Sequence, residues 1–363
     1  MDTAPEIQWC FSTHAPSRRH EIPPLVGWLA RAFYNAEKSP LGVHPAVVHY
    51  RSFRNTDPPR LVEVWNEAFP GRGAVALRNS TPLERFVLAK PYFDPAGLVL
   101  AEEDNRCLGF AHSAVVNPGA GPKQGVICML GIRPSHRGRG IGPELLRRTE
   151  AYLQQHGAQI FLAGGYDRSN PFYFGIYGGA NCPGFLQSNP EAEALFLKSG
   201  YRTHQTIFIL QRQLDVPLRV SDPRFGPLRM QYQICMRSPR RLKYWWQECT
   251  VGVVEPLEFV LMNKDNQVKA RALAWEMEGF SARWGWPAVG VIDFEVAPDS
   301  RRLGLGKYLL TAILKQLQDQ YFQTVEVQID ERDTLAIDFL SPLGFEQVDL
   351  GRVYAKDVPQ ANS

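Results

Sequence analysis

Two segments rich in glycine and arginine have the composition of an anion-binding turn. Residues 132–142 read IRPSHRGRGIG and residues 296–306 read VAPDSRRLGLG, so Arg-x-x-Gly-x-Gly occurs twice, starting at Arg137 and at Arg301. Each segment follows an apolar run typical of a strand and precedes an amphipathic helical pattern. A helix start exposes backbone N–H groups, its dipole favours negative charge, and glycine lets a phosphate approach the backbone. The two segments therefore predict two phosphate-binding loops.

A second pattern follows each loop. One segment runs from Asn189 to Gly200 and the other, with the same spacing, from Asp333 to Gly344. Asparagine and aspartate are good helix N-caps, and glycine suits the left-handed residue that ends a helix. We therefore expect a short helix, then a strand, in both places.

With both patterns in this order, twice, the chain resembles the GNAT acyltransferases over roughly residues 46–213 and 228–357. The loops look like that family's pyrophosphate loop, and the later segments look like its last-helix signature. The resemblance implies an α/β (α+β) fold of two tandem GNAT domains, each a mixed central β-sheet flanked by helices. It also implies acetyl-CoA as the acyl donor and N-acetyltransferase activity towards a primary amine of a small molecule or peptide. We expect no metal. The positions expected to contact acetyl-CoA are Ile132, Arg137, Gly138, Arg139, Gly140, Ile141, Gly142, Asn189, Val296, Arg301, Arg302, Leu303, Gly304, Leu305 and Gly306.

Carboxylates that could take a proton from the attacking amine stand before one of the two loops. A free alkyl amine has a pKa of about 10.4, so transfer at neutral pH needs a base. Strict alternation along residues 289–296 places Asp293 and Glu295 on one face of the expected strand. The matching positions before the first loop are Met129 and Gly131. We expect Asp293 or Glu295 to be the base; a solvated or ion-paired strand face is the other interpretation.

The proton donor for the departing thiolate is a separate question. Many members of the family use a tyrosine seven residues after the last helix's cap, and here Phe196 and Leu340 match that position. The first repeat carries an insertion near residues 164–188 with several aromatic residues among glycines. Tyr173 or Tyr177 of this insertion could replace the missing acid. Alternatively, the insertion is a wedge between the two domains or ordinary core.

The elements that must position these residues form two repeats. Hairpin-like stretches at residues 97–116 and 257–275 precede the strands that lead into the loops. The expected organisation is an N-terminal extension at 1–45, a first domain at 46–213, a linker at 214–227, a second domain at 228–357 and a tail at 358–363.

Composition excludes several other classes of protein. The formal net charge of +3 and the pI near 8.5 are too mild to indicate a nucleic-acid or anionic-membrane partner. The six cysteines form no CxxC pair, so neither a zinc site nor a redox motif is indicated, and they fit reduced thiols. The sequence shows no secretory signal and no apolar stretch of membrane-spanning length. We therefore expect a cytoplasmic protein.

Two other functions fit the repeated plan. One is a CoA-binding module in which one or both halves lack catalysis, and the missing tyrosines favour it. The other is a transferase that uses aminoacyl-tRNA, which the weak net charge and the CoA-type loops do not favour. Trp275, Trp284 and Trp286 are candidates for the wall of an acceptor cleft, although packing is the commoner role of tryptophan.

Overall fold

The structure is a computed structural model that describes residues 47–116, 121–166, 170–218, 220–239, 242 and 245–358. The expected extension at residues 1–45 and nearly all of the expected tail lie outside these ranges. Within the described part of the chain, no helix combines the length and the apolar character needed to cross a membrane.

The strands of the described residues form one mixed sheet. Its order is β1-β2-β3-β4-β5-β13-β7-β12-β11-β10-β9-β8, and the short β6 pairs with β13. The strands of the first half are β1 (His49–Ser52), β2 (Leu98–Glu103), β3 (Arg106–Val116), β4 (Gln124–Ile132), β5 (Ile160–Ala163), β6 (Phe185–Leu186) and β7 (Arg202–Gln213). Those of the second half are β8 (Tyr232–Arg237), β9 (Leu257–Asn263), β10 (Val268–Glu276), β11 (Ala288–Val296), β12 (Thr324–Asp330) and β13 (Glu346–Asp357).

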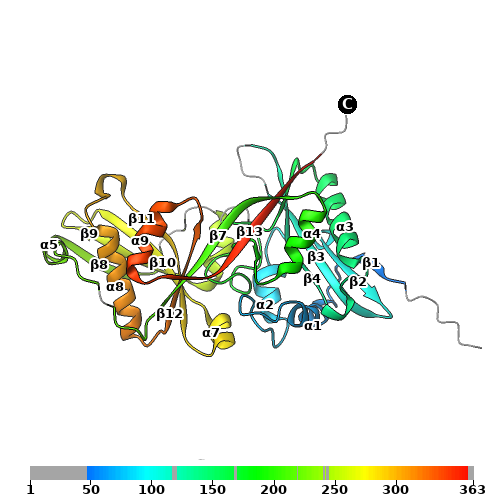
Figure 1. Cartoon of the computed structure of the whole chain (residues 1–363), viewed down its shortest axis with the longest axis horizontal. Coiled ribbons are helices and arrows are strands. Elements are labelled where there is room, and N and C mark those ends of the chain that lie inside the picture. The colour runs from blue at the N-terminus through cyan, green and yellow to red at the C-terminus, as the bar shows by residue number, and fades with distance from the viewer. Residues whose placement is uncertain are drawn as a thin grey trace, which may run out of the picture. The chain divides into compact units, whose positions relative to one another are not determined.

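The two halves exchange their last strands. β13, from the second half, pairs with β5 of the first half, and β7, from the first half, pairs with β12 of the second. β7 and β13 also pair with each other, and Figure 1 shows them running side by side between the two sets of helices. The domain limits expected from the sequence, 46–213 and 228–357, stay predictions, because both repeats contribute to one continuous sheet.

Helices cover both faces of this sheet. In the first half they are α1 (Pro58–Ala68), α2 (Thr81–Leu83), α3 (Ile141–Gln155) and α4 (Pro190–Lys198), with a π-helical turn at Glu84–Leu88 and 3-10 turns at Pro95–Gly97 and Pro134–His136. In the second half they are α5 (Phe225–Gln231), α6 (Trp245–Thr250), α7 (Glu278–Trp284), α8 (Leu305–Asp319) and α9 (Thr334–Leu340), with 3-10 turns at Gly252–Val254, Pro298–Ser300 and Ser341–Leu343.

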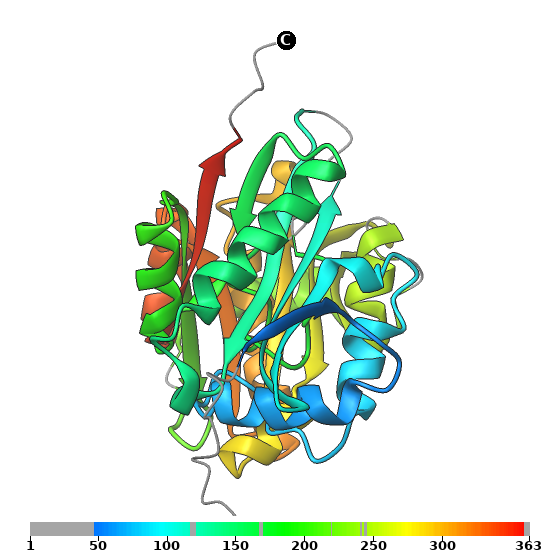
Figure 2. The same cartoon turned by 90° about the vertical axis from the view of Figure 1, so that its right-hand side faces the viewer.

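Alternation along the strands explains why the sheet is covered on both sides. In β2, Leu98 and Leu100 join the core that α1 packs against, whereas Val99 and Ala101 join the core beneath α3. Figure 2, which looks onto the first half, shows α3 lying across the strands. In the second half α8 packs on β9, β10 and β11. Each fully buried leucine of such a helix contributes about 2 kcal/mol. The buried apolar residues of α8 are Leu305, Leu309, Leu310, Ile313, Leu314 and Leu317.

Most of the expected local elements are confirmed. Both hairpins form, as β2–β3 and β9–β10. Asp333 caps α9 by accepting a hydrogen bond from the Ala336 amide (3.0 Å), and Gly200 and Gly344 are left-handed. Asn189 occupies the expected N-cap position of α4, but its side chain makes no cap bond and donates instead to the Tyr177 hydroxyl (2.9 Å).

Candidate functional site

The first loop leaves its backbone open at the start of a helix. The 3-10 turn that follows β4 leads through extended Arg137 to Gly138 and Gly140, whose φ angles are 76° and 79°. Gly140 is the N-cap residue of α3, and no side chain caps that helix. A Cβ added at either glycine would meet nothing within 4 Å. The first N–H groups of α3 therefore have room for an anion, and the left-handed angles explain why glycine stands at both positions.

Arginines and a close strand–helix contact frame this loop. Arg137 forms an ion pair with Glu191 (2.6 Å), and Arg139 forms one with Glu103. A Cβ at Gly142 would lie 3.2 Å from the Ile132 side chain, so the third glycine lets α3 start close against the end of β4. Asn189, expected to contact the cofactor, bonds within the protein as described above. The structure thus brings Arg137, Arg139 and the glycines together around one turn.

The second loop has the same backbone but different surroundings. Arg302, with φ of 65°, stands where the first loop has Gly138, and Gly304 (φ 86°) is the N-cap of α8. A Cβ at Gly304 would lie 2.9 Å from the guanidinium carbon of Arg224. Arg224 comes from the segment that joins the two halves, so this segment partly covers the second loop. The sequence did not single out Arg224.

Asp222 holds the covering arginine in place. Its carboxylate accepts hydrogen bonds from the Arg224 side chain at 2.7 and 2.8 Å, and it lies 3.5 Å from the Lys307 ammonium in the first turn of α8. The Arg224 guanidinium keeps the pKa of Asp222 far below its ordinary value. A carboxylate and a guanidinium of the protein therefore lie beside the second loop.

The parallel strand pairs that lead to both loops separate before they reach them. Pairing of β4 with β5 ends at Ile127 and Ala163, although β4 continues to Ile132. Pairing of β11 with β12 ends at Gly290 and Glu326, although β11 continues to Val296. In each half the two parallel strands therefore diverge on the side of the loop.

A β-bulge interrupts β11 at the carboxylates. Arg271 of β10 pairs with Glu295 but Leu273 pairs with Ile292, so two residues of β11 oppose one of β10, and Asp293 has a φ of 52°. Strict alternation, from which the shared face of Asp293 and Glu295 was inferred, therefore does not hold across these residues.

Both carboxylates have partners. Gln247 of α6, which is buried, donates a hydrogen bond from Nε2 to Oδ2 of Asp293. Oε2 of Glu295 lies 3.2 Å from Nε of Arg271, and the Glu295 side chain is about half exposed (52%). The bulge thus turns Asp293 towards α6, whereas Glu295 belongs to a surface ion pair. Gln247 was not recognised from the sequence, because its link to Asp293 spans elements that are distant along the chain.

The two tyrosines of the insertion lie in the core. The Tyr173 ring stacks on Trp65 of α1 (centroids 5.8 Å apart), and its hydroxyl lies 3.1 Å from Nδ1 of His112. The Tyr177 hydroxyl accepts from Asn189 and from the Leu186 amide (3.2 Å). Burial raises the pKa of Tyr177 to about 12. These contacts support the packing interpretation, as do the burial of Phe196 and Leu340 at the usual position of the acid.

The same insertion also contacts the second half. The Ala180 amide donates to Oε1 of buried Glu326 (2.7 Å), and its carbonyl accepts from Nε1 of Trp275 (3.0 Å). The side-chain amide of Gln328 donates to the Gly178 carbonyl (2.7 Å). Burial raises the pKa of Glu326. The insertion is therefore a wedge that packs against both repeats, one of the three interpretations of it from the sequence.

The sequence of the chain matches a known protein family. The profile of the acetyltransferase (GNAT) family matches residues 59–176 and 227–345. A mycothiol acetyltransferase of Acidimicrobium ferrooxidans is 35% identical over 111 residues, which cover 30% of this chain and 34% of that protein. One from Salinispora arenicola is 25% identical over 311 residues, 80% of this chain and 91% of that protein. The alignments to the first relatives thus span about a third of those proteins' length.

Solved structures share the fold. A tandem GNAT protein from the clavulanic acid biosynthesis pathway superposes with a TM-score of 0.60 at 14% identity, covering 87% of this chain and all of that one (100%). An N-acetyltransferase related to GCN5 from Sphaerobacter thermophilus superposes with a TM-score of 0.56 at 16% identity, covering 85% and 95%. At these identities the likeness concerns the fold alone.

Proposed function

The chain belongs to the acetyltransferase (GNAT) family, and we propose that it is an N-acetyltransferase that moves an acetyl group from acetyl-CoA to a primary amine of a small molecule or peptide. The observation that carries this proposal is the first loop. There a strand end, two left-handed glycines and a helix start without a side-chain cap leave backbone amides facing open space. The similarity to mycothiol acetyltransferases supports transfer of an acetyl group.

The loop residues fit the pyrophosphate of acetyl-CoA. The N–H groups of residues 138–142 would donate to its oxygens, and Arg137 and Arg139 would add positive charge. Their present partners, Glu191 and Glu103, form ion pairs at the surface. Such pairs contribute about 0–1 kcal/mol, so exchanging a carboxylate for a phosphate costs little. The second loop fits the same group, with Arg302 and Arg224 as the cations.

We assign the proton transfer to Asp293 of the second half. In the reaction the amine nitrogen bonds to the thioester carbon, the C–S bond breaks, and the thiolate leaves with the electron pair. Asp293 accepts the proton that the amine loses, directly or through water, and the hydrogen bond from Gln247 orients its carboxylate. The bulge in β11 leaves one residue outside the strand ladder, next to the carboxylate that we assign as the base.

The first half is suited to binding acetyl-CoA but not to the transfer, which uses acetyl-CoA bound at the second loop. Its strand carries Met129 and Gly131 in place of carboxylates, and the insertion fills the face against α1. Tyr173 and Tyr177 are the second choice for a proton donor, because their hydroxyls are buried and bonded within the protein. The alternative function considered from the sequence, a CoA-binding module without catalysis, then applies to the first half only.

Calorimetric titration with acetyl-CoA tests the proposal. Gly140→Glu places a negative charge at the first loop, and Gly140→Ala is its matched control, with the same left-handed strain of about 1–2 kcal/mol but no charge. Leu303→Glu adds a charge at an exposed position of the second loop, where Gly304 itself contacts Arg224.

We expect Gly140→Glu to weaken one site at least about tenfold more than Gly140→Ala, whose added Cβ also lies where the phosphate would approach but carries no charge. Leu303→Glu should weaken the other site and leave the first unchanged. A folded wild-type protein that binds no acetyl-CoA would refute the proposed function.

A further inference from the structure

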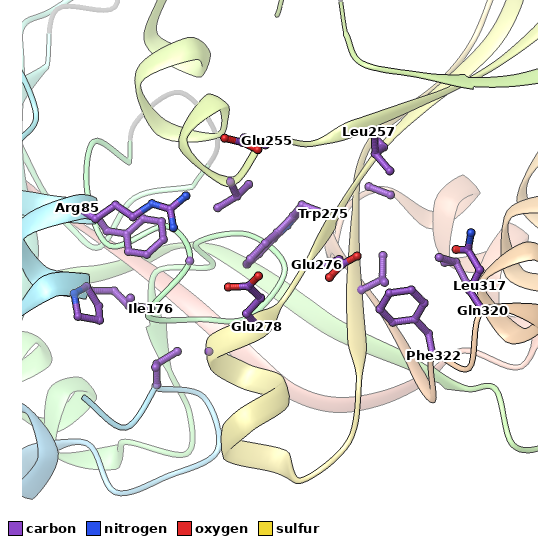
Figure 3. A pocket seen from close by; sticks show the side chains of 18 of the residues that line it. Arg85, Ile176, Glu255, Leu257, Trp275, Glu276, Glu278, Leu317, Gln320 and Phe322 are labelled. Atoms are coloured by element: carbon purple, nitrogen blue, oxygen red, sulfur yellow. The ribbon is translucent and has the colours of Figure 1, made fainter. Parts of the chain in front are cut away.

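A pocket apart from both loops lies between elements of the two repeats. Its volume is about 550 Å³, within the range of sites that enclose small organic ligands. One wall comes from the first half, with Arg85 and Phe86 of the π-helical turn, and the other from the second half, with Trp275 and Glu276 at the end of β10 (Figure 3).

The pocket is distinct from the candidate acetyl-CoA site. It reaches Leu317 and Gln320 at the C-terminal end of α8, whereas the second loop lies at that helix's N-terminal end. Fifteen helical residues with a rise of 1.5 Å each put roughly 20 Å between the two places. Neither loop nor Asp293 lines the pocket.

The charges around the pocket favour a cation. Glu255, Glu276 and Glu278 line it, with Arg85 as their opposite charge. Among the described residues, none forms an ion pair with these three glutamates. Arg85 donates to the Val253 carbonyl and lies over the Phe86 ring, 5.4 Å from its centroid. The lining therefore carries an excess of negative charge that the described residues do not neutralise.

Aromatic side chains form the apolar part of the lining of this acidic pocket. Trp275 is buried, and its Nε1 donates to the Ala180 carbonyl of the wedge, which fixes the orientation of the ring. Figure 3 shows Trp275 in the middle of the lining, with Glu276 and Glu278 near it and Phe322 beyond. Rings of this kind attract ammonium groups through their faces, most strongly when the cation is partly desolvated.

We propose that this pocket is a binding site for a small organic cation, an ammonium group on an apolar or aromatic body. The glutamates attract the ammonium group, and the rings of Trp275, Phe86 and Phe322 contact the apolar part of the ligand. An anion such as a CoA phosphate would face three carboxylates and is disfavoured. The inference goes beyond the proposed transfer, since it requires neither acetyl-CoA nor an amine that can be acetylated.

The test is calorimetry on the full chain with benzyltrimethylammonium, whose nitrogen cannot be acetylated. The uncharged comparison ligand is 3-phenylpropan-1-ol. The double variant Glu276→Gln/Glu278→Gln removes charge at nearly constant size, and Glu346→Gln, an exposed glutamate of β13 outside the pocket, is its matched control. Thermal melts establish that each variant is folded.

We expect wild type to prefer the cation and the double variant to bind it about three- to tenfold more weakly, with Glu346→Gln unchanged. Equal binding of the alcohol, or a double variant that binds like wild type, would overturn the inference. A protein that binds the cation without acetyl-CoA affinity would leave the inference intact and remove only the proposed function.

Discussion

Tyr354 in the last strand lies opposite Ala163 in the last parallel strand of the first half. Beyond β13, Val327 of β12 lies opposite Leu210 of β7, so each repeat's final strand completes the other repeat's part of the sheet. The chain joins the two halves at residues 214–227, and each half also needs a strand of the other half to pair with the edge of its own part of the sheet. Neither half alone contains all the strands of its part of the sheet.

This exchange predicts that the halves do not fold separately. A fragment ending at residue 217 would leave both edges of β7 and one edge of β5 without the strands they pair with, and such edges promote aggregation. We expect neither 1–217 nor 218–363 alone to show cooperative thermal unfolding by circular dichroism. The two fragments produced together should form a one-to-one complex that unfolds cooperatively. A monomeric, cooperatively unfolding single fragment would contradict the argument.

Asp293 and Glu295 can be distinguished by kinetics. If Asp293 accepts the amine proton, Asp293→Asn should lower kcat about 10²- to 10⁴-fold and change KM little. Glu295→Gln is the matched control on the same strand, and we expect an effect below about threefold, because Glu295 is mainly exposed and paired with Arg271. The readout is release of the CoA thiol with a panel of primary amines. A larger loss in Glu295→Gln would reassign the base.

Asp222 and Arg224 should have opposite effects on the second loop. Arg224→Ala removes a cation beside Gly304, so acetyl-CoA affinity there should fall about three- to tenfold. Asp222→Asn frees Arg224 from its ion pair, so affinity should rise. Arg229→Ala, an exposed arginine of α5, is the control that changes net charge alone. Titration of acetyl-CoA into variants that also carry Gly140→Glu measures binding at the second loop alone. If both variants change the affinity in the same direction, Arg224 has no electrostatic role there.

The sequence predicted those features that depend on neighbouring residues. The turns around Gly138, Gly140 and Gly304 need left-handed angles, and the apolar spacing of α8 selects one buried face, so both could be inferred locally. The exchange of β7 and β13 could not be inferred, because the residue pattern of each strand is the same whichever half it pairs with. The bulge at Asp293 likewise changes the backbone without any glycine or proline to indicate it.

Contacts between distant segments account for the rest of the site. Arg224 belongs to a segment that reads as a linker, and only the folded chain brings it over Gly304. By composition, the aromatic insertion fits a source of the missing acid and a wedge between the domains. Hydrogen bonds from Ala180 to Glu326 and from Trp275 to Ala180 distinguish the two, and these partners are more than ninety residues apart in the chain.

Buried His112 predicts how stability depends on pH. Burial lowers its pKa from 6.5 to about 3, so in the folded state it stays neutral while the unfolded chain takes up a proton near pH 6.5. Below that pH the unfolded state binds more protons, so stability falls as the pH falls, by at most about 1.4 kcal/mol per pH unit. Between pH 7 and 5 we expect a loss of about 2 kcal/mol from this residue.

Urea unfolding at pH 5, 6 and 7 measures the effect of His112. The double variant His112→Leu/Tyr173→Phe removes both members of the 3.1 Å contact, so no buried partner is left behind, and its pH dependence should be shallower by that 2 kcal/mol or so. His204→Gln, at an exposed histidine of β7, should keep the wild-type slope. Identical slopes in wild type and the double variant would mean that His112 takes up a proton in the folded protein as readily as in the unfolded chain.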